Sequence, residues 1–290
     1  MAPLPISARM AKPRDKTLSP STALLPPCPG PKLQPFEPQD ALIKWGPRLG
    51  KTSTDDADSQ GFVFRVEIAS RAYAIKIFKF YHPASEKFYW ETYLGKSYPL
   101  TKVIFYTDPF YAECRAYGRI NQARNEGTVK EDIATRCHGY LLLTTEDMMW
   151  LEHEKGIDLR TDLIDEDLRR ALGGDLRARA IVKDLETGDS GLNKGNIGRA
   201  WRNVSLQNSL NIYNRDVREE NFMNGRIVDF GSSWTEPHAI LDSADAKDAD
   251  EAREQRLRDC SGFDEMTEKG RIKTTLKTPT SQHNLRPRKK

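Results

Sequence analysis

Proline is concentrated at the start of this 290-residue sequence, and its distribution limits which part of the chain can fold. Ten of the 17 prolines lie before residue 39. Because proline fixes φ and lacks a backbone N–H, this stretch is unsuited to a helix or a hydrogen-bonded strand. We therefore expect residues 1–38 to form a proline-rich, disordered arm that buries almost nothing.

Charged residues dominate the other end of the chain, 242–290, where we expect a charged helical or disordered tail. Residues 242–268 carry ten acidic and four basic side chains, whereas residues 269–290 carry eight basic side chains and no acidic one. The acidic part favours helix but has few apolar residues, which predicts a solvated helix or an unfolded segment. The basic part either aids solubility or serves as a nuclear-import or polyanion-binding arm. Direct contact with nucleic acid is expected only through this basic tail.

The composition is typical of a folded centre between two such ends. Hydrophobic residues make up 38% of the chain and charged residues 30%, against roughly 45–50% and ~25% in ordinary globular domains. The four cysteines are scattered and form no metal-binding or disulfide pattern, which favours a reducing compartment. Because no apolar run reaches the ~18 residues of a membrane helix and no secretory signal is recognisable, we expect a soluble intracellular protein with no membrane partner.

Residues 39–241 are predicted to form the folded domain. Alternating apolar and polar residues on both sides of a short loop predict a hairpin within 61–80. Asp108 followed by Pro109 predicts the start of a helix. The other expected elements are two short buried strands, a helix, and a closing hairpin turned by Asn-Gly: 139–143, 180–185, 198–214 and 222–230. Strands first and helices later indicate an α+β protein with two lobes.

The most informative stretch is 214–221, Asn-Arg-Asp-Val-Arg-Glu-Glu-Asn, which is followed by Asp-Phe-Gly at 229–231. It resembles the H-R-D-x-x-x-x-N loop of protein kinases and their D-F-G motif. In kinases the loop aspartate accepts the proton of the attacking hydroxyl, and the asparagine and the second aspartate hold magnesium against the nucleotide phosphates. The resemblance therefore implies Asp216 as the catalytic residue and Asn221 and Asp229 as Mg²⁺ ligands in an ATP site.

Two further parts of the kinase pattern lie upstream in the expected order. The run Tyr-Ala-Ile-Lys, ending at Lys76, resembles the V-A-I-K strand, whose lysine holds the α- and β-phosphates. Glu113 on the next helix is the expected partner of that lysine. Gly50 and Gly61 correspond to the ends of the glycine-rich phosphate loop, so the resemblance assigns all four residues to nucleotide binding. The alternative is an ordinary strand lysine and a solvated helix glutamate.

Three departures from the kinase pattern argue against an active protein kinase. The loop glycines are eleven positions apart, and the insertion between them carries Asp55, Asp56 and Asp58. Their charges oppose a phosphate, unless the insertion is a surface loop that points them into solvent. Arg218 replaces the lysine that usually follows the catalytic aspartate. After Gly231 the chain lacks the A-P-E motif and the helical platform that presents peptide substrates. The last departure argues against a protein kinase more than against a small-molecule phosphotransferase.

Arg215 is the arginine that faces a phosphorylated activation segment in the kinase template. Here Ser232, Ser233 and Thr235 follow Asp229 so closely that a phosphate on any of them would repel its carboxylate. We therefore expect a structural role for Arg215, paired with backbone carbonyls or a nearby acid.

Aromatic residues crowd the insertion between Lys76 and Glu113. Ten of them lie within residues 78–106. They form either a small core of their own or a patch that binds a partner, and the sequence leaves both alternatives open.

The resemblance narrows to one family through four runs of sequence: 108–119, 137–143, 180–185 and 214–238. They are similar to a fungal family of kinase-like proteins named for a subunit of the Sim-four inner-kinetochore complex. That resemblance implies a two-lobed protein-kinase-like fold with a reduced C-terminal lobe. It also implies a nuclear protein of the kinetochore or centromere whose partners are other subunits of that complex. The implied function is a pseudokinase-like scaffold with a residual ATP site, and the alternative is an active ATP- and Mg²⁺-dependent phosphotransferase.

Overall fold

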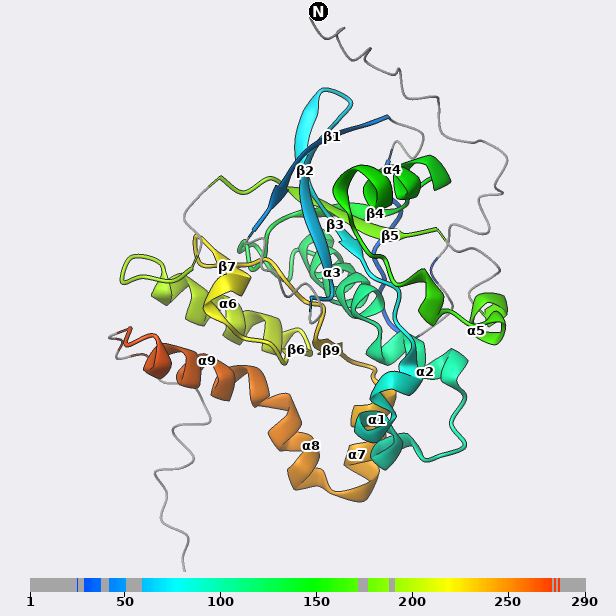
Figure 1. Cartoon of the computed structure of the whole chain (residues 1–290). Coiled ribbons are helices and arrows are strands. Elements are labelled where there is room, and N and C mark those ends of the chain that lie inside the picture. Colours follow the sequence, from blue (N-terminus) through cyan, green and yellow to red (C-terminus); the bar gives the residue numbers. More distant parts are fainter. Residues whose placement is uncertain are drawn as a thin grey trace, which may run out of the picture.

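A five-stranded antiparallel sheet forms one side of the molecule, and helices with two short strand pairings form the other (Figure 1). The computed structural model describes residues 25, 29–37, 42–50, 59–171, 177–187, 191–272, 274 and 276. The strands of the sheet are β1 (Ile43–Leu49), β2 (Gly61–Ile68), β3 (Arg71–Phe78), β4 (Cys137–Leu142) and β5 (Arg179–Asp184). They are ordered β1-β2-β3-β5-β4, and every neighbouring pair is antiparallel. Between β4 and β5 the chain forms α4 (Thr145–Lys155), η4 (Thr161–Leu163) and α5 (Glu166–Ala171).

The hairpin predicted within 61–80 is confirmed as β2 and β3. Its turn residues, Ala69 and Ser70, have φ values of +49° and +63°. Positive φ at both central positions matches a two-residue turn whose twist suits the flanking strands. Ile75 and Ile77 are fully buried on β3, and Lys76 stands between them, paired in register with Ile181 of β5.

Helix α3 (Pro109–Asn125) begins where the sequence predicts, and it lies against the sheet. The Asp108 carboxylate accepts a hydrogen bond from the Phe110 N–H at 2.8 Å, which satisfies one of the free donors of the first turn. Asp108 is fully buried and forms an ion pair with Arg179 of β5. This cap therefore ties the start of α3 to the sheet and sets the position of Glu113, about one turn further along.

The second half of the molecule is built around α6 (Ile197–Ser209). Strand β6 (Ile212–Asn214) pairs with β9 (Ser233–Thr235), while β7 (Phe222–Met223) pairs with β8 (Arg226–Ile227) after the single turn η5 (Glu219–Asn221). Asn224 and Gly225 turn the closing hairpin with φ values of +49° and +74°, as the sequence predicts. The predicted helix at 198–214 is shorter than expected, because its last residues form β6.

The aromatic insertion folds into η3 (Pro83–Glu86), α1 (Lys87–Leu94) and α2 (Leu100–Thr107). Trp90 and Val103 of this insertion form a second hydrophobic core with Trp234, Ile240 and Leu241. Core packing therefore holds for most of the ten aromatic residues, but in two cores: Tyr89, Trp90, Tyr93 and Tyr98 lie in or against this one, and Phe78, Phe80, Tyr81 and Phe105 lie in or against the main core. Phe88 is the exception, since 80% of its surface is exposed.

The expectation that residues 1–38 bury nothing is wrong for the described part of that arm, 29–37. Leu33 and Phe36 are each only 3% exposed. Their N–H groups donate to the carbonyls of Cys114 on α3 and Tyr140 on β4, both at 2.9 Å. Proline permits this extended path because the hydrogen bonds fall on the residues between prolines. Residues 1–24 lie outside the described residues.

The C-terminal boundary at 241 also differs from the structure, because it falls inside a helix. Residues 239–269 form α7 (Ala239–Lys247), α8 (Ala249–Arg256) and α9 (Arg258–Lys269), which pass beneath α6 in Figure 1. Phe263 is completely buried, and Cys260 and Met266 are buried beside it. Three apolar residues at helical spacing are enough to pack an otherwise charged helix. The basic tail beyond residue 276 lies outside the described residues.

Across the described ranges, no helix is long and apolar enough to cross a membrane.

Candidate functional site

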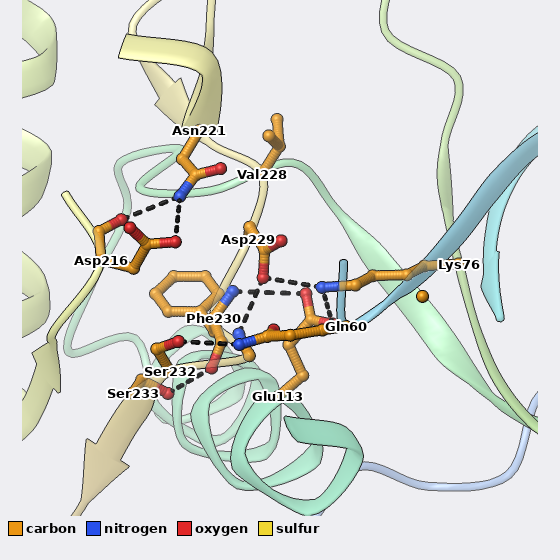
Figure 2. Close-up of polar contacts among 12 residues, drawn as sticks. Gln60, Lys76, Glu113, Asp216, Asn221, Val228, Asp229, Phe230, Ser232 and Ser233 are labelled. Atoms are coloured by element: carbon orange, nitrogen blue, oxygen red, sulfur yellow. Dashed lines mark hydrogen bonds and ion pairs between the residues drawn. The ribbon is translucent and has the colours of Figure 1, made fainter. Parts of the chain in front are cut away.

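Three of the predicted site residues meet between the sheet and α3 (Figure 2). Lys76 on β3 places its Nζ 3.2 Å from Glu113 Oε2 and 2.7 Å from Asp229 Oδ1. Glu113 is fully buried and the Lys76 side chain is 7% exposed, whereas Asp229 retains 31% exposure. The lysine therefore links the helix to the D-F-G segment. The alternative that Glu113 is a solvated helix glutamate is wrong, because its side chain is buried.

A second lysine, which the sequence analysis did not single out, enters the same cluster from β5. Lys183 Nζ lies 2.5 Å from Glu113 Oε1 and donates to the Val228 carbonyl at 2.7 Å. Glu113 Oε1 also accepts the Phe230 N–H at 3.3 Å. The Glu113 carboxylate thus has one lysine on each oxygen.

The charges of this cluster control the pKa values inside it. Burial alone raises the pKa of Asp229, but Lys76 and Lys183 together hold it below its usual range. Burial alone lowers the pKa of Lys183, yet the carboxylates of Glu113 and Asp229 outweigh burial and raise it. Asp229 and Lys183 are therefore both charged at neutral pH, and each favours the charged form of the other.

The predicted catalytic residue, Asp216, is held by its own loop. Arg218 grips both of its carboxylate oxygens at 2.6 Å. Asn221 Nδ2 donates to the Asp216 carbonyl at 2.8 Å and to Oδ2 at 3.2 Å. The asparagine thereby closes the loop 216–221, and its amide nitrogen points towards Asp216 (Figure 2).

Asn214 connects this loop to the lysine cluster. Its Nδ2 donates to the Asp229 carbonyl at 3.0 Å, and its Oδ1 accepts the Asp216 N–H at 3.0 Å. The residue that replaces the histidine of the kinase motif therefore fixes the two aspartates relative to each other.

The two predicted loop glycines are not brought into the cluster by any described contact. Gly50 is exposed at the end of β1 with φ +85°. Gly61 begins β2, and a Cβ there would lie 2.1 Å from the Ile77 carbonyl oxygen, so this glycine serves close strand pairing. The insertion with Asp55, Asp56 and Asp58 lies outside the described residues.

Gln60, directly before Gly61, reaches across to the segment after Asp229. Its Nε2 donates to Ser232 Oγ at 2.8 Å. Its Oε1 lies so close to Gly231 that a Cβ on that glycine would stand 1.9 Å away. The Gln60 side chain therefore covers the backbone beside Asp229 (Figure 2).

Part of the predicted magnesium site is already engaged. Asp229 Oδ1 accepts from Lys76 and from the Gly231 N–H at 2.8 Å. The Asn221 amide nitrogen donates to Asp216, and among the described residues no group of three or more acidic, cysteine or histidine side chains could hold a metal. A magnesium ion would have to bind through the other carboxylate oxygen of Asp229 and the amide oxygen of Asn221.

We expected Arg215 to pair with backbone carbonyls or a nearby acid, but among the described residues it has no such partner. Its Nη1 donates to Gln255 Oε1 at 2.6 Å, and its guanidinium lies 3.9 Å from the centroid of the Trp234 ring. The expectation was wrong because α8, which carries Gln255, was predicted to be a solvated or unfolded segment.

Two residues of this site, Lys183 and Gln60, were therefore not predicted from the sequence. A signal existed for the lysine, since it interrupts the apolar run Ala-Ile-Val-Lys and a buried charge requires a partner. No sequence signal marked Gln60, because its contact with Ser232 depends on where the chain re-enters the sheet.

The predicted kinase-like fold is confirmed by this architecture. An antiparallel five-stranded sheet carries Lys76, the helix packed on it carries Glu113, and two loops between short hairpins carry Asp216 and Asp229. In the part of the chain that the structure describes, the region after Gly231 consists of β9 and three helices, as the missing A-P-E motif predicts.

Known proteins similar to this chain include solved structures and a protein family. Among the solved structures is vaccinia related kinase 3, at 11% sequence identity, with a TM-score of 0.35 over 73% of this chain and 54% of that chain. Another is a Neurospora crassa PAN3 pseudokinase mutant, at 11% sequence identity, with a TM-score of 0.34 over 84% of this chain and 50% of that chain. The chain spans about half the length of each. No curated protein sequence matches it. The family model described as kinetochore Sim4 complex subunit FTA2 matches residues 22–234, well over half of the chain. The chain therefore belongs to the FTA2 family of kinetochore Sim4 complex subunits.

Proposed function

We propose that this protein is a non-catalytic, kinase-like scaffold subunit of an inner-kinetochore complex, acting in the nucleus at the centromere. Its family membership supports a kinetochore role and protein partners. The observation that carries the non-catalytic part is the contact of Gln60 with Ser232 at 2.8 Å, over Gly231. In the kinase template this region receives the nucleotide phosphates, so ATP would have to displace the glutamine.

The state of Asp216 supports the same proposal. A general base must be able to approach and accept a proton from the attacking hydroxyl. Arg218 holds both oxygens of this carboxylate and occupies lone pairs that a substrate would need. A substrate hydroxyl would have to compete with a bidentate ion pair.

The helices after the site favour a scaffold over an enzyme of protein substrates. Helix α7 packs against α1 of the aromatic insertion, and α9 packs against α6. Among the described residues these helices take the place of a peptide-binding platform, and they bind the insertion to the rest of the fold.

An active ATP- and Mg²⁺-dependent phosphotransferase is the alternative. It is favoured by the convergence of Lys76, Glu113 and Asp229, with Asp216 and Asn221 in the adjoining loop. The two functions differ in their need for the Asp216 carboxylate, because a scaffold requires only its shape and a phosphotransferase requires its charge.

The test replaces the native protein in its host cells with tagged wild type or Asp216→Asn. A scaffold predicts that both recover the same kinetochore subunits and localise to the centromere. Asp167→Asn, at a carboxylate whose side chain is 87% exposed, is the matched control. Loss of function in Asp216→Asn, with the protein level and partner recovery unchanged, would favour the phosphotransferase instead.

A further inference from the structure

A cavity of about 590 Å³ opens beside the candidate site. It lies where four parts of the chain meet: the end of β3, the segment from η3 into α1, the junction of α2 with α3, and the residues after Asp229. Gln60 and Ser232, which cover the nucleotide side of the site, also contribute to its wall. The cavity is therefore contiguous with the region where the kinase pattern is most altered.

Aromatic side chains make up much of the cavity wall. Those that line it are Phe80, Tyr81, Phe88, Tyr89, Tyr106 and Trp234. Phe88 has the largest exposed fraction, 80%, of any large apolar side chain in the described ranges. Leaving such a side chain in water is unfavourable, and exposed aromatic residues beside a concavity are typical of protein-binding surfaces.

The charge of the cavity is positive. Three cationic side chains line it, Lys79, Arg160 and Arg215, against one carboxylate, Glu86. Glu86 accepts a hydrogen bond from the Tyr81 hydroxyl at 3.4 Å, so part of its capacity is already used.

Arg215 gives the cavity its specific chemistry. Its guanidinium stacks 3.9 Å from the Trp234 centroid and 5.3 Å from that of Tyr89, and no described carboxylate lies within ion-pair distance. Burial lowers the pKa of Arg215, and the neighbouring charge of Arg258 lowers it further. A partly desolvated guanidinium held flat by aromatic rings is preorganised for a planar anion such as a carboxylate.

We infer that this cavity docks an acidic segment of a partner protein, with a carboxylate on Arg215 and an adjacent apolar side chain against Phe88. The inference rests on the proposed scaffold function and names the surface through which it acts. Charge complementarity favours an acidic peptide, and the aromatic walls favour a peptide over a free inorganic anion, which would leave them uncovered.

The test measures binding of the purified full chain to the reconstituted subunits of its complex. Phe88→Ser should weaken binding by roughly tenfold or more, as expected for an aromatic anchor. Met149→Ser is the matched control, since Met149 is another exposed apolar residue, 52% exposed, that does not line the cavity. Because Phe88 is so exposed, its truncation leaves the folded core unchanged.

A second measurement identifies the occupant. Arg160→Lys places an amine in the cavity wall, which a carbodiimide reagent can join to a nearby carboxylate. The inference predicts cross-links from position 160 to aspartate or glutamate of a partner subunit.

Four results would overturn the inference. Equal binding of Phe88→Ser and Met149→Ser would remove the cavity as a docking site while leaving the scaffold function intact. Cross-links only to this chain or a second copy of it, or complete competition by millimolar phosphate, would assign the cavity to another occupant. If the wild type recovers no kinetochore subunit, both this inference and the proposed function fail.

Discussion

Gln60 and Ser232 hold the two sides of the candidate site together, through a 2.8 Å hydrogen bond from Gln60 Nε2 to Ser232 Oγ. Gln60 precedes the first residue of β2, and Ser232 follows the Asp-Phe-Gly segment. The bond therefore links the sheet to the segment that bears Asp229, across the place that a nucleotide would enter. The residues that match the kinase motifs are therefore covered by Gln60, which belongs to none of those motifs.

Removing this bond should open the site. Gln60→Ala deletes both the hydrogen bond and the side chain that covers Gly231, so we expect the affinity for a fluorescent ATP analogue to rise about fivefold, the equivalent of one hydrogen bond of roughly 1 kcal/mol. Gln122→Ala, at an exposed glutamine of α3, is the control and should change nothing. Equal affinities for Gln60→Ala and the wild type would show that Gln60 does not block the site.

Lys183 should matter for stability far more than a surface lysine does. Lys183→Met leaves Glu113 buried with one ammonium group instead of two, and we expect a loss of about 3 kcal/mol in the free energy of unfolding. Lys44→Met removes an exposed pair with Glu67 and should cost at most ~0.5 kcal/mol. Urea denaturation measures the free energy of unfolding of both variants. Losses of similar size would contradict the claim that Lys183 stabilises a buried ionic cluster.

Gly118 should be intolerant of a side chain although it lies within a helix. A Cβ there would stand 2.5 Å from the Lys32 backbone, so Gly118→Ala should push the 29–37 segment off α3 and expose it to protease. Gly198→Ala, on α6 with nothing within 4 Å of the added Cβ, should instead stabilise the fold by up to roughly 1 kcal/mol. Stabilisation by both substitutions would mean that the segment is not docked.

Asp259 should make the anchoring of α9 dependent on pH. It is fully buried, accepts hydrogen bonds from Asn208 and Gln207, and has its pKa raised by burial to about 6. The folded state therefore holds the proton more tightly than the unfolded state, where the pKa is ~4. Protonation of Asp259 therefore adds to the free energy of unfolding. This contribution is fully present below pH ~4 and is lost as the pH rises through about 6.

Asp259→Asn should remove that dependence. We expect the variant to be more stable than the wild type at pH 7.5, by up to about 3 kcal/mol, and close to it at pH 4. The new amide can also donate to Gln207 Oε1, a buried acceptor without a partner. Glu254→Gln on the exposed face of α8 is the control, with no change in the difference between the two pH values. A wild type that is more stable than Asp259→Asn at pH 7.5 would contradict the account.

Local signals in the sequence were sufficient to predict the structural elements that depend only on neighbouring residues. The Asp108 cap, the β2–β3 hairpin and the Asn224-Gly225 turn all occur where they are predicted, because each depends on residues adjacent in the chain. Of the site, the motifs identified Lys76, Glu113 and Asp229, which the structure brings into contact.

The rest depended on tertiary contacts that no local pattern reveals. In the sequence, Leu33 and Phe36 look like part of a proline-rich coil. They are buried because Gly118 on α3 and Gly139 on β4 leave room for their segment. The same holds for Phe263, whose burial depends on α6. Gln60 and Lys183 act on residues far away in the sequence, so their roles follow only from the fold.

The measurement that tests the central claim most directly is the melting temperature of the full chain with and without millimolar Mg-ATP. Binding to the folded state alone would stabilise it by roughly 2.7 kcal/mol at a hundredfold excess over Kd. A non-catalytic scaffold with Gln60 in the site predicts no shift for the wild type and the same result for Asp229→Ala. A clear upward shift in the wild type that Asp229→Ala abolishes would contradict the account and establish a working nucleotide site.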